Sequence, residues 1–158
     1  MKAIVFDIDG VLADISHRLH YILKANKKER DYEKFYACLN DDLPIPQGIL
    51  LAKILKGYVE SVTDESFVFV YLSGRPERTR EATKQWLDTH VGFSETDILY
   101  LRRNRDWRKA EAYKLEMLQR LQAKGIEPWL IFDDSERICK ELRKNGFVCY
   151  QTQEYINA

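Results

Sequence analysis

The chain has 158 residues, 45% hydrophobic and 32% charged, which is typical of one globular domain with a substantial core. Lys plus Arg and Asp plus Glu both number 25, so the net charge favours no class of partner. The three cysteines lack a C-x-x-C spacing, which argues against a zinc site or a disulfide framework. No apolar run approaches the roughly 18 residues of a membrane span, and no signal-peptide pattern precedes the first strand. We therefore expect a cytoplasmic protein that forms a single domain over residues 1–158 and does not enter membranes.

The first predicted strand carries the most informative stretch of the sequence. Residues 3–6 form an apolar, β-branched run typical of a buried strand. Asp7 and Asp9 follow at once, and Gly10 permits a sharp turn. Two acids at the carboxyl end of a strand lie where open α/β sheets place their ligands, and they favour a divalent cation. The alternative is an ordinary turn with solvated aspartates.

Residues 14–45 are expected to form a small helical insertion over the end of this strand. Apolar residues recur at helical spacing between 15 and 23 and again between 32 and 39. Asp41 and Asp42 lie in an Asn- and Pro-rich stretch, so we interpret them as turn residues rather than metal ligands. His17 and His20 are interpreted as surface or packing residues, with a place at the site entrance as the alternative.

The remaining elements alternate between helix and strand. We predict helices over 47–60, 77–91 and 107–124, and one that follows a cap at Ser135 and ends at 145–146. Strands are predicted over 67–72, 97–101, 129–132 and 147–150. This alternation implies right-handed crossovers and a parallel sheet covered on both faces.

Three predicted strands end in polar residues. Asp7 and Asp9 follow the first, Ser73-Gly74-Arg75 follows the second, and Asp133-Asp134 follows a later one. The carboxyl ends of parallel strands share one edge, so these groups can converge there. A phosphate with Mg²⁺ explains the set, because the cation offsets both the carboxylates and the phosphate. Ser73 and nearby backbone N–H groups can donate to phosphate oxygens.

Lys114 is the expected cationic partner of these acids. It is in helical register with Ala110, Leu118 and Leu121 and so lies on the sheet-facing side of its helix. There it either pairs with the carboxylates or extends to the rim, and pairing is favoured because an unpaired buried ammonium is costly.

These motifs resemble those of the haloacid dehalogenase (HAD) superfamily in its phosphatase branch. The sequences Asp7-Ile-Asp9-Gly-Val, Leu72-Ser-Gly-Arg75, a helix lysine at 114 and Asp133-Asp134 carry the resemblance. The chain is most similar to the 3′-phosphatase domain of phage-type polynucleotide kinase. The resemblance implies a Rossmann-like three-layer α/β sandwich with a central parallel sheet and the 14–45 segment as a small cap. It differs at Ala110, where the family usually has an acid.

The resemblance also implies roles for individual residues. Asp7 would be the nucleophile that forms an aspartyl-phosphate, and Asp9 the general acid and base, with a pKa that crowded carboxylates raise. Mg²⁺ would bind Asp7, the backbone carbonyl of Asp9, and Asp134. Ser73, Lys114 and Asp133 would complete the catalytic set. The implied substrate contacts are Arg18, Gly74, Arg75, Arg102 and Arg108.

The substrate itself is left open by these motifs. The leading hypothesis is a phosphomonoesterase for a nucleic-acid end, with a 3′-phosphate as the favoured target. The alternatives are a phosphatase for free nucleotides or another small phosphoester, and a non-catalytic binding module. Arg102, Arg103 and Arg105 could contact further phosphates and Trp107 could stack on a base; otherwise residues 102–109 are a solvated connection with Trp107 as a core anchor. A separate kinase or ligase is an expected partner.

Overall fold

The structure is a computed structural model and describes residues 1–154. Its centre is a five-stranded sheet of order β5-β4-β1-β6-β7, in which all neighbouring strands are parallel. The strands are β1 (Lys2–Phe6), β4 (Phe67–Pro76), β5 (Ile98–Arg102), β6 (Glu127–Asp133) and β7 (Cys149–Gln151). This confirms the predicted parallel sheet, and it places β1 in the middle with β4 and β6 on either side.

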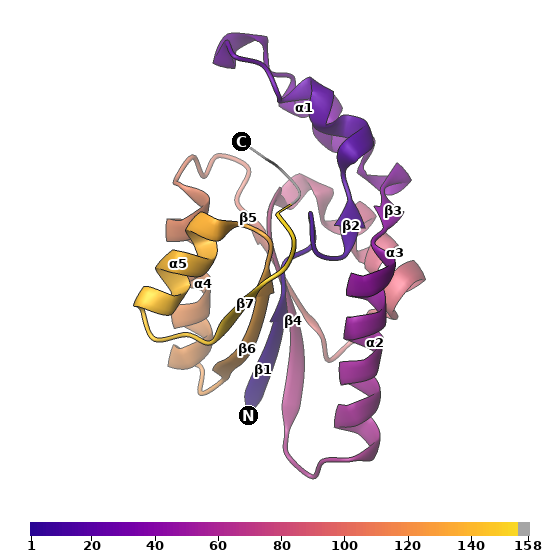
Figure 1. Cartoon of the computed structure of the whole chain (residues 1–158), viewed down its shortest axis with the longest axis vertical. Coiled ribbons are helices and arrows are strands. Elements are labelled where there is room, and N and C mark those ends of the chain that lie inside the picture. The colour runs from indigo at the N-terminus through magenta and orange to yellow at the C-terminus, as the bar shows by residue number, and fades with distance from the viewer. Residues whose placement is uncertain (155–158) are drawn as a thin grey trace.

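Helices cover both faces of the sheet, so the predicted three-layer sandwich is confirmed. The helices α2 (Pro46–Ser61) and α3 (Arg80–Val91) lie on one face, and α4 (Ala110–Ala123) and α5 (Glu136–Lys144) on the other (Figure 1). Successive residues of β1 point to opposite faces: Ile4 and Phe6 join the core beneath α2 and α3, whereas Ala3 and Val5 join the core beneath α4 and α5. The sheet is therefore buried on both sides, as parallel sheets require.

The helices follow the predictions with shifted boundaries. α2 continues through Gly57 to Ser61, and α3 is preceded by the 3₁₀ turn η4 (Glu77–Thr79). The helix predicted from residue 107 begins at Ala110. The preceding residues remain a loop because the Asp106 carboxylate accepts a hydrogen bond from the Arg108 backbone N–H and so holds a turn. Ser135 caps α5 as predicted, accepting from the Ile138 backbone N–H.

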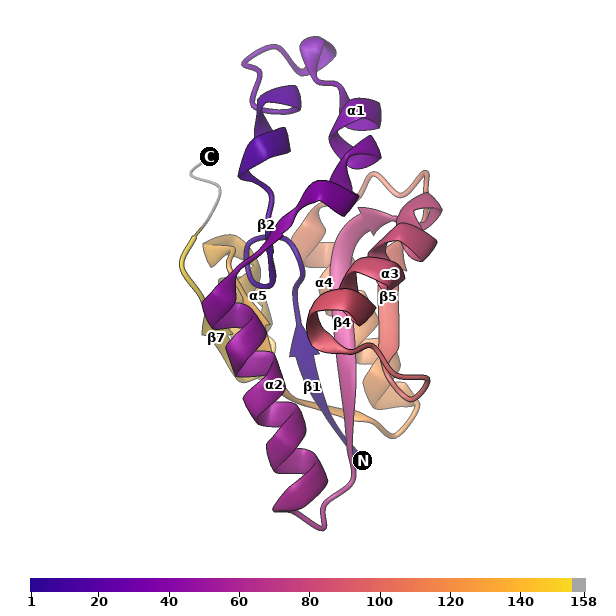
Figure 2. The same ribbon diagram turned by 90° about the vertical axis from the view of Figure 1, so that its right-hand side faces the viewer.

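The insertion lies beyond the carboxyl ends of the sheet strands (Figures 1 and 2). It contains the 3₁₀ helices η1 (Ser16–Tyr21), η2 (Lys27–Glu29) and η3 (Leu39–Asp41) and the α-helix α1 (Tyr32–Ala37). A two-stranded antiparallel ribbon of β2 (Ala13–Asp14) and β3 (Leu43–Pro44) joins its two ends. The helical character agrees with the prediction, but the ribbon is an addition, since two-residue strands leave no periodic signal in a sequence.

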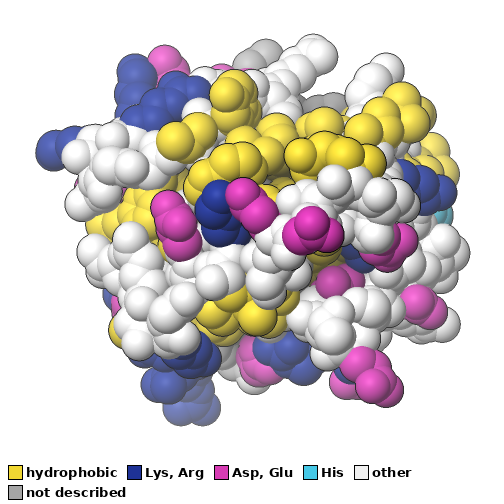
Figure 3. Space-filling view, turned by 90° about the horizontal axis from the view of Figure 1, so that it is seen from below, with side chains coloured by type: hydrophobic (Ala, Val, Ile, Leu, Met, Phe, Trp, Pro, Cys, Tyr) yellow, Lys and Arg dark blue, Asp and Glu magenta, His cyan; other side chains and the backbone are white. Residues whose placement is uncertain are grey.

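The two ends of the sheet differ in how charge is arranged. At the end opposite the insertion, basic and acidic side chains are interspersed among hydrophobic ones (Figure 3). At the carboxyl ends of β1, β4 and β6, by contrast, acids and bases are buried together, including Asp7, Arg75 and Asp133. Among the described residues, no helix has the length and apolar character needed to cross a membrane.

Candidate active site

Three buried aspartates converge at the carboxyl ends of β1 and β6. These strands are paired through Phe6 and Phe132, and the Asp7 backbone N–H donates to the Phe132 carbonyl at 2.9 Å. One carboxylate oxygen each from Asp7, Asp133 and Asp134 lies within 4.8 Å of the others, and all three residues are buried. The convergence predicted from parallel strand ends is therefore present for these acids.

Lys114 is the cation that faces this cluster, which confirms the predicted pairing. Its side chain is buried, and its Nζ lies 2.9 Å from an Asp7 oxygen and 2.5 Å from an Asp133 oxygen. Burial alone would lower the pKa of Lys114, but the charges of Asp133 and Asp7 outweigh it and raise that pKa above its ordinary 10.5. The ammonium therefore stays charged at any physiological pH and remains available to an anion bound beside Asp7.

The acid cluster carries more negative charge than Lys114 alone offsets. Burial raises the pKa of Asp7 well above its ordinary 3.8, and the charges of Asp133, Asp134 and Asp9 raise it further, against the opposing effect of Lys114. Buried carboxylates crowded in this way are oxygen ligands suited to a divalent cation.

Gly10 shows that the backbone is shaped around these ligands. It has a φ of +85°, and a Cβ at this position would lie 2.2 Å from an Asp134 carboxylate oxygen. Only glycine allows the loop after β1 to pass this close to Asp134. The residues present thus fit a Mg²⁺ ion bound by Asp7, Asp134 and the loop that follows β1.

Asp9 belongs to a different cluster, made of two acids and two arginines. One oxygen of Asp9 accepts from Arg75 at 2.6 and 3.0 Å and from Arg18 at 3.2 Å. Asp42 accepts from Arg18 at 2.7 and 2.8 Å and from Arg75 at 3.0 Å. Both arginine side chains are fully buried. Arg18 and Arg75, two of the five residues predicted to contact substrate, are therefore held by carboxylates, and they lie beside Asp9.

Asp42 is the functional-site residue that sequence reasoning missed. Its interpretation as a turn residue is wrong, because its side chain is fully buried between Arg18 and Arg75. Its backbone carbonyl also accepts from the Trp86 indole N–H at 2.8 Å, which anchors the insertion to α3. Asp41 remains exposed, as a turn residue would. The only sequence signal was an acid in the same inserted segment as Arg18, which the resemblance assigns to the substrate.

The protonation of Asp9 differs from the sequence-based expectation of a raised pKa. Burial does raise it, but the charges of Arg75 and Arg18 outweigh burial and lower the pKa of Asp9 below its ordinary 3.8. Burial, together with the charges of three nearby carboxylates, instead raises the pKa of Asp7 against the opposing charge of Lys114.

This shift predicts how Asp9 contributes to stability as the pH changes. Because the pKa of Asp9 is lower in the folded chain than the ordinary 3.8, its ionised form stabilises the fold above that pH. We expect the difference in unfolding free energy between the wild type and Asp9→Asn to be constant near neutrality and to shrink as the pH falls below 3.8. Urea unfolding over a pH series measures it. A difference that instead grew toward acid pH would contradict the assigned direction.

The Ser73-Gly74-Arg75 motif lies at the end of β4, beside β1. Ser73 is buried, and its hydroxyl accepts from the Arg75 backbone N–H at 3.1 Å. A Cβ at Gly74 would lie 3.7 Å from the guanidinium of Arg102, so Arg102 borders this turn. Arg102 also donates to the Arg108 carbonyl at 2.8 Å, which ties the end of β5 to the loop before α4.

The loop before α4 only partly matches the predictions. Arg108 is exposed and pairs with Asp106 and Glu116 instead of standing free. Trp107 is 86% exposed, so its interpretation as a core anchor is wrong. Packing buries most tryptophans, and an indole this exposed is available to a ligand. His17 lies beside Asp42, with its Nε2 2.8 Å from an Asp42 oxygen, and the His20 ring packs at a tilt against Tyr21.

Comparison with known proteins places this chain in a family. The family model described as the polynucleotide kinase PNKP phosphatase domain matches residues 1–155. In the Pnkp1/Rnl/Hen1 RNA repair complex, a chain with 22% identity and a TM-score of 0.73 covers 96% of this chain. This chain spans only 42% of that protein. The HAD domain of effector protein Lem4 from Legionella pneumophila has 18% identity and a TM-score of 0.54, covering 97% of this chain and 85% of its own.

A HAD-superfamily hydrolase of subfamily IA from Geobacter sulfurreducens is also similar, with 17% identity, a TM-score of 0.52 and coverage of 96% of this chain and 89% of its own. At these identities the solved structures support the fold, whereas the family match extends over nearly the whole sequence. The chain belongs to the PNKP phosphatase-domain family of the HAD superfamily.

Proposed function

We propose that this chain is a Mg²⁺-dependent phosphomonoesterase that removes a terminal phosphate, favouring the 3′-phosphate of a polynucleotide. The observation that carries the proposal is the position of Asp7. Its carboxylate is buried at the strand end between Lys114 and two further aspartates, so a nucleophile, a cation and a metal-binding set meet at one point. We also propose that residues 1–158 act as one phosphatase domain in the cytoplasm, with 14–45 as its cap.

In this proposal Asp7 attacks phosphorus, and the terminal P–O bond breaks to leave an aspartyl-phosphate. A carboxylate needs no base to become a nucleophile. Mg²⁺, when held by Asp7, Asp134 and the Asp9 backbone carbonyl, would supply the positive charge that keeps Asp7 ionised and offsets its repulsion from the phosphate. Lys114 and Ser73 would hold the transferring group, and Asp133 would orient Lys114, to which it is bonded at 2.5 Å.

Asp9 would donate a proton to the leaving oxygen and then accept one from the water that hydrolyses the intermediate. The arginines lower its pKa, so the free site holds Asp9 ionised. A bound phosphate dianion would oppose the charges of Arg75 and Arg18 and raise the pKa of Asp9 again. Substrate binding itself would thereby favour the protonated, catalytically useful form.

The family match and the surroundings of the site support a polynucleotide as substrate. Arg103, Arg105 and Trp107 are exposed on the loop that follows β5, next to Arg102 and the Ser73-Gly74 turn. Cations interleaved with an exposed aromatic suit a single strand that continues beyond its terminal phosphate. The match to a chain from an RNA repair complex supports a separate kinase or ligase as a partner.

A panel of substrates tests the proposal. Phosphate release is measured from a 3′-phosphorylated oligonucleotide, its 5′-phosphorylated counterpart, nucleoside 3′- and 5′-monophosphates and p-nitrophenyl phosphate, each with Mg²⁺ and with EDTA. We expect kcat/KM to be highest for the 3′-phosphorylated oligonucleotide, and chelation to stop release from every substrate because the acid cluster lacks its cation.

Each alternative has a distinct signature in the same panel. Preference for mononucleotides by a wide margin would reject the polynucleotide substrate while keeping the phosphatase. Release that continues in EDTA would reject the metal dependence. Binding of oligonucleotides without release from any substrate would identify a non-catalytic module.

A further inference from the structure

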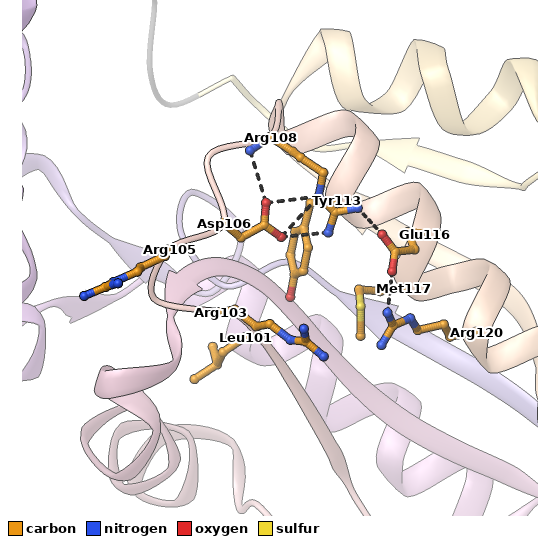
Figure 4. A pocket seen from close by; sticks show the side chains of 9 residues that line it. All are labelled: Leu101, Arg103, Arg105, Asp106, Arg108, Tyr113, Glu116, Met117 and Arg120. Carbon is orange, nitrogen blue, oxygen red and sulfur yellow. Dashed lines mark hydrogen bonds and ion pairs between the residues drawn. The ribbon is translucent and has the colours of Figure 1, made fainter.

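A pocket of about 500 Å³ lies between the end of β5 and the outer side of α4 (Figure 4). The apolar side chains of Leu101 and Met117 line it together with the ring of Tyr113. None of the residues assigned above to phosphoryl transfer lines this pocket. It therefore needs an explanation separate from the chemistry at Asp7.

The pocket carries an excess of positive charge. Four arginines line it against two carboxylates, those of Asp106 and Glu116. Arg108 pairs with both acids and Arg120 pairs with Glu116 at 2.5 Å. Within residues 1–154, no ion pair engages Arg103. Two positive charges are thus left over on a concave surface, which favours an anionic ligand.

Tyr113 provides a second and independent indication of a ligand. The residue is only 2% exposed, and its buried hydroxyl has no hydrogen-bond partner among the described residues. Figure 4 shows the hydroxyl end of the ring directed toward the Arg103 side chain. A buried hydroxyl without a partner is costly, so a donor left in this state beside guanidinium groups indicates an oxygen acceptor that comes from outside the chain.

Arg102 connects this pocket to the active site. Its guanidinium lies 5.1 Å from the centre of the Tyr113 ring on one side and borders Gly74 on the other. A strand whose terminal phosphate lies at Ser73 and Gly74 can therefore pass Arg102 and reach Tyr113. The side chains on this route are cationic or aromatic, as single-strand binding requires.

We propose that this pocket holds an internucleotide phosphate of the substrate strand, with Arg103, Arg120 and the Tyr113 hydroxyl as donors to its oxygens. The sugar or base next to this phosphate packs on Leu101 and Met117. This inference rests on the proposed function and names the part of a polynucleotide, beyond its terminal phosphate, that the chain recognises.

The test measures binding separately from catalysis. Fluorescence anisotropy follows a labelled single-stranded oligothymidylate of about ten nucleotides with a 3′-hydroxyl end, over a series of salt concentrations. For Arg103→Ala/Arg120→Ala we expect Kd to rise about tenfold at low salt, and the slope of log Kd against log salt to fall by about 0.7 for each phosphate that the variant no longer neutralises. Tyr113→Phe, which removes only the hydroxyl, should weaken binding by a smaller factor.

Arg137→Ala/Lys144→Ala is the matched control, because both residues are exposed on α5 and lie outside the pocket. It removes two positive charges and should leave Kd and the salt slope unchanged. Equal losses of affinity in the two double variants would overturn the proposal, since they would reflect net charge alone. Thymidine monophosphate that displaces the oligothymidylate at equal concentration would also overturn it, in favour of a free nucleotide as the ligand.

The outcome also separates this proposal from the proposed function. Loss of binding in Arg103→Ala/Arg120→Ala, together with a wild type that does not release 3′-phosphate, would support the pocket and reject the 3′-phosphatase. Wild-type release of 3′-phosphate, together with unchanged binding in Arg103→Ala/Arg120→Ala, would support the 3′-phosphatase and reject the pocket.

Discussion

Replacing Asp7 by asparagine is expected to lower kcat by at least about four orders of magnitude with every phosphorylated substrate. The amide cannot attack phosphorus, so the site would lose its proposed nucleophile, and the oxygen that remains to bind the cation would carry no negative charge. Lys114 would remain bonded to Asp133, so the drop in rate would come from the chemistry and not from the position of the lysine. Steady-state phosphate release measures the effect.

The folded state of the Asp7→Asn variant should be retained. Because burial and three carboxylates disfavour the charge of Asp7, removing this charge should leave the free energy of unfolding equal to or above that of the wild type. Asp88→Asn, an exposed change on α3, serves as the matched control with full activity. Residual turnover of Asp7→Asn above about one percent of the wild type would reject the aspartyl-phosphate mechanism.

Asp42→Asn should be the most destabilising single change at the site, by about 3–5 kcal/mol. Asp42 is fully buried and accepts from both Arg18 and Arg75. An amide in its place leaves two buried guanidinium groups with Asp9 as their only carboxylate in this cluster. Breaking a buried ion pair from one side costs more than the pair contributes, because the remaining charge stays buried. Urea unfolding gives the free energy directly.

Asp41→Asn is the matched control for this prediction. It makes the same chemical change one residue earlier at an exposed position, so the unfolding free energy should change by less than about 0.5 kcal/mol. Similar values for the two variants would show that the buried cluster of Asp9, Arg18, Asp42 and Arg75 does not hold the insertion on the sheet. Because the cluster also includes Asp9, we expect Asp42→Asn to lose phosphatase activity even under conditions in which it stays folded.

Local sequence patterns were enough to predict the sheet and its acidic edge. The apolar run before Asp7 and the one before Asp133 both became central strands, and the parallel order brought their terminal acids together. Lys114 was placed correctly because helical periodicity alone puts it on the face with Leu118 and Leu121, which are fully buried. Each of these inferences depends on residues that are neighbours in the sequence.

The chain by itself therefore determined the α/β fold, the acids at the strand ends and the lysine that faces them. The tertiary structure alone decided the environment of Asp9, which depends on Arg75, separated from it by 66 residues in the chain. It likewise decided that Asp42 is buried, through a contact with Arg18 across 24 residues, and that Trp107 is exposed. Periodicity predicts which face of an element is buried, but the pairing of charges between distant segments depends on how those segments pack. At Asp9 this packing sets the pKa, because it brings Arg75 and Arg18 beside the carboxylate.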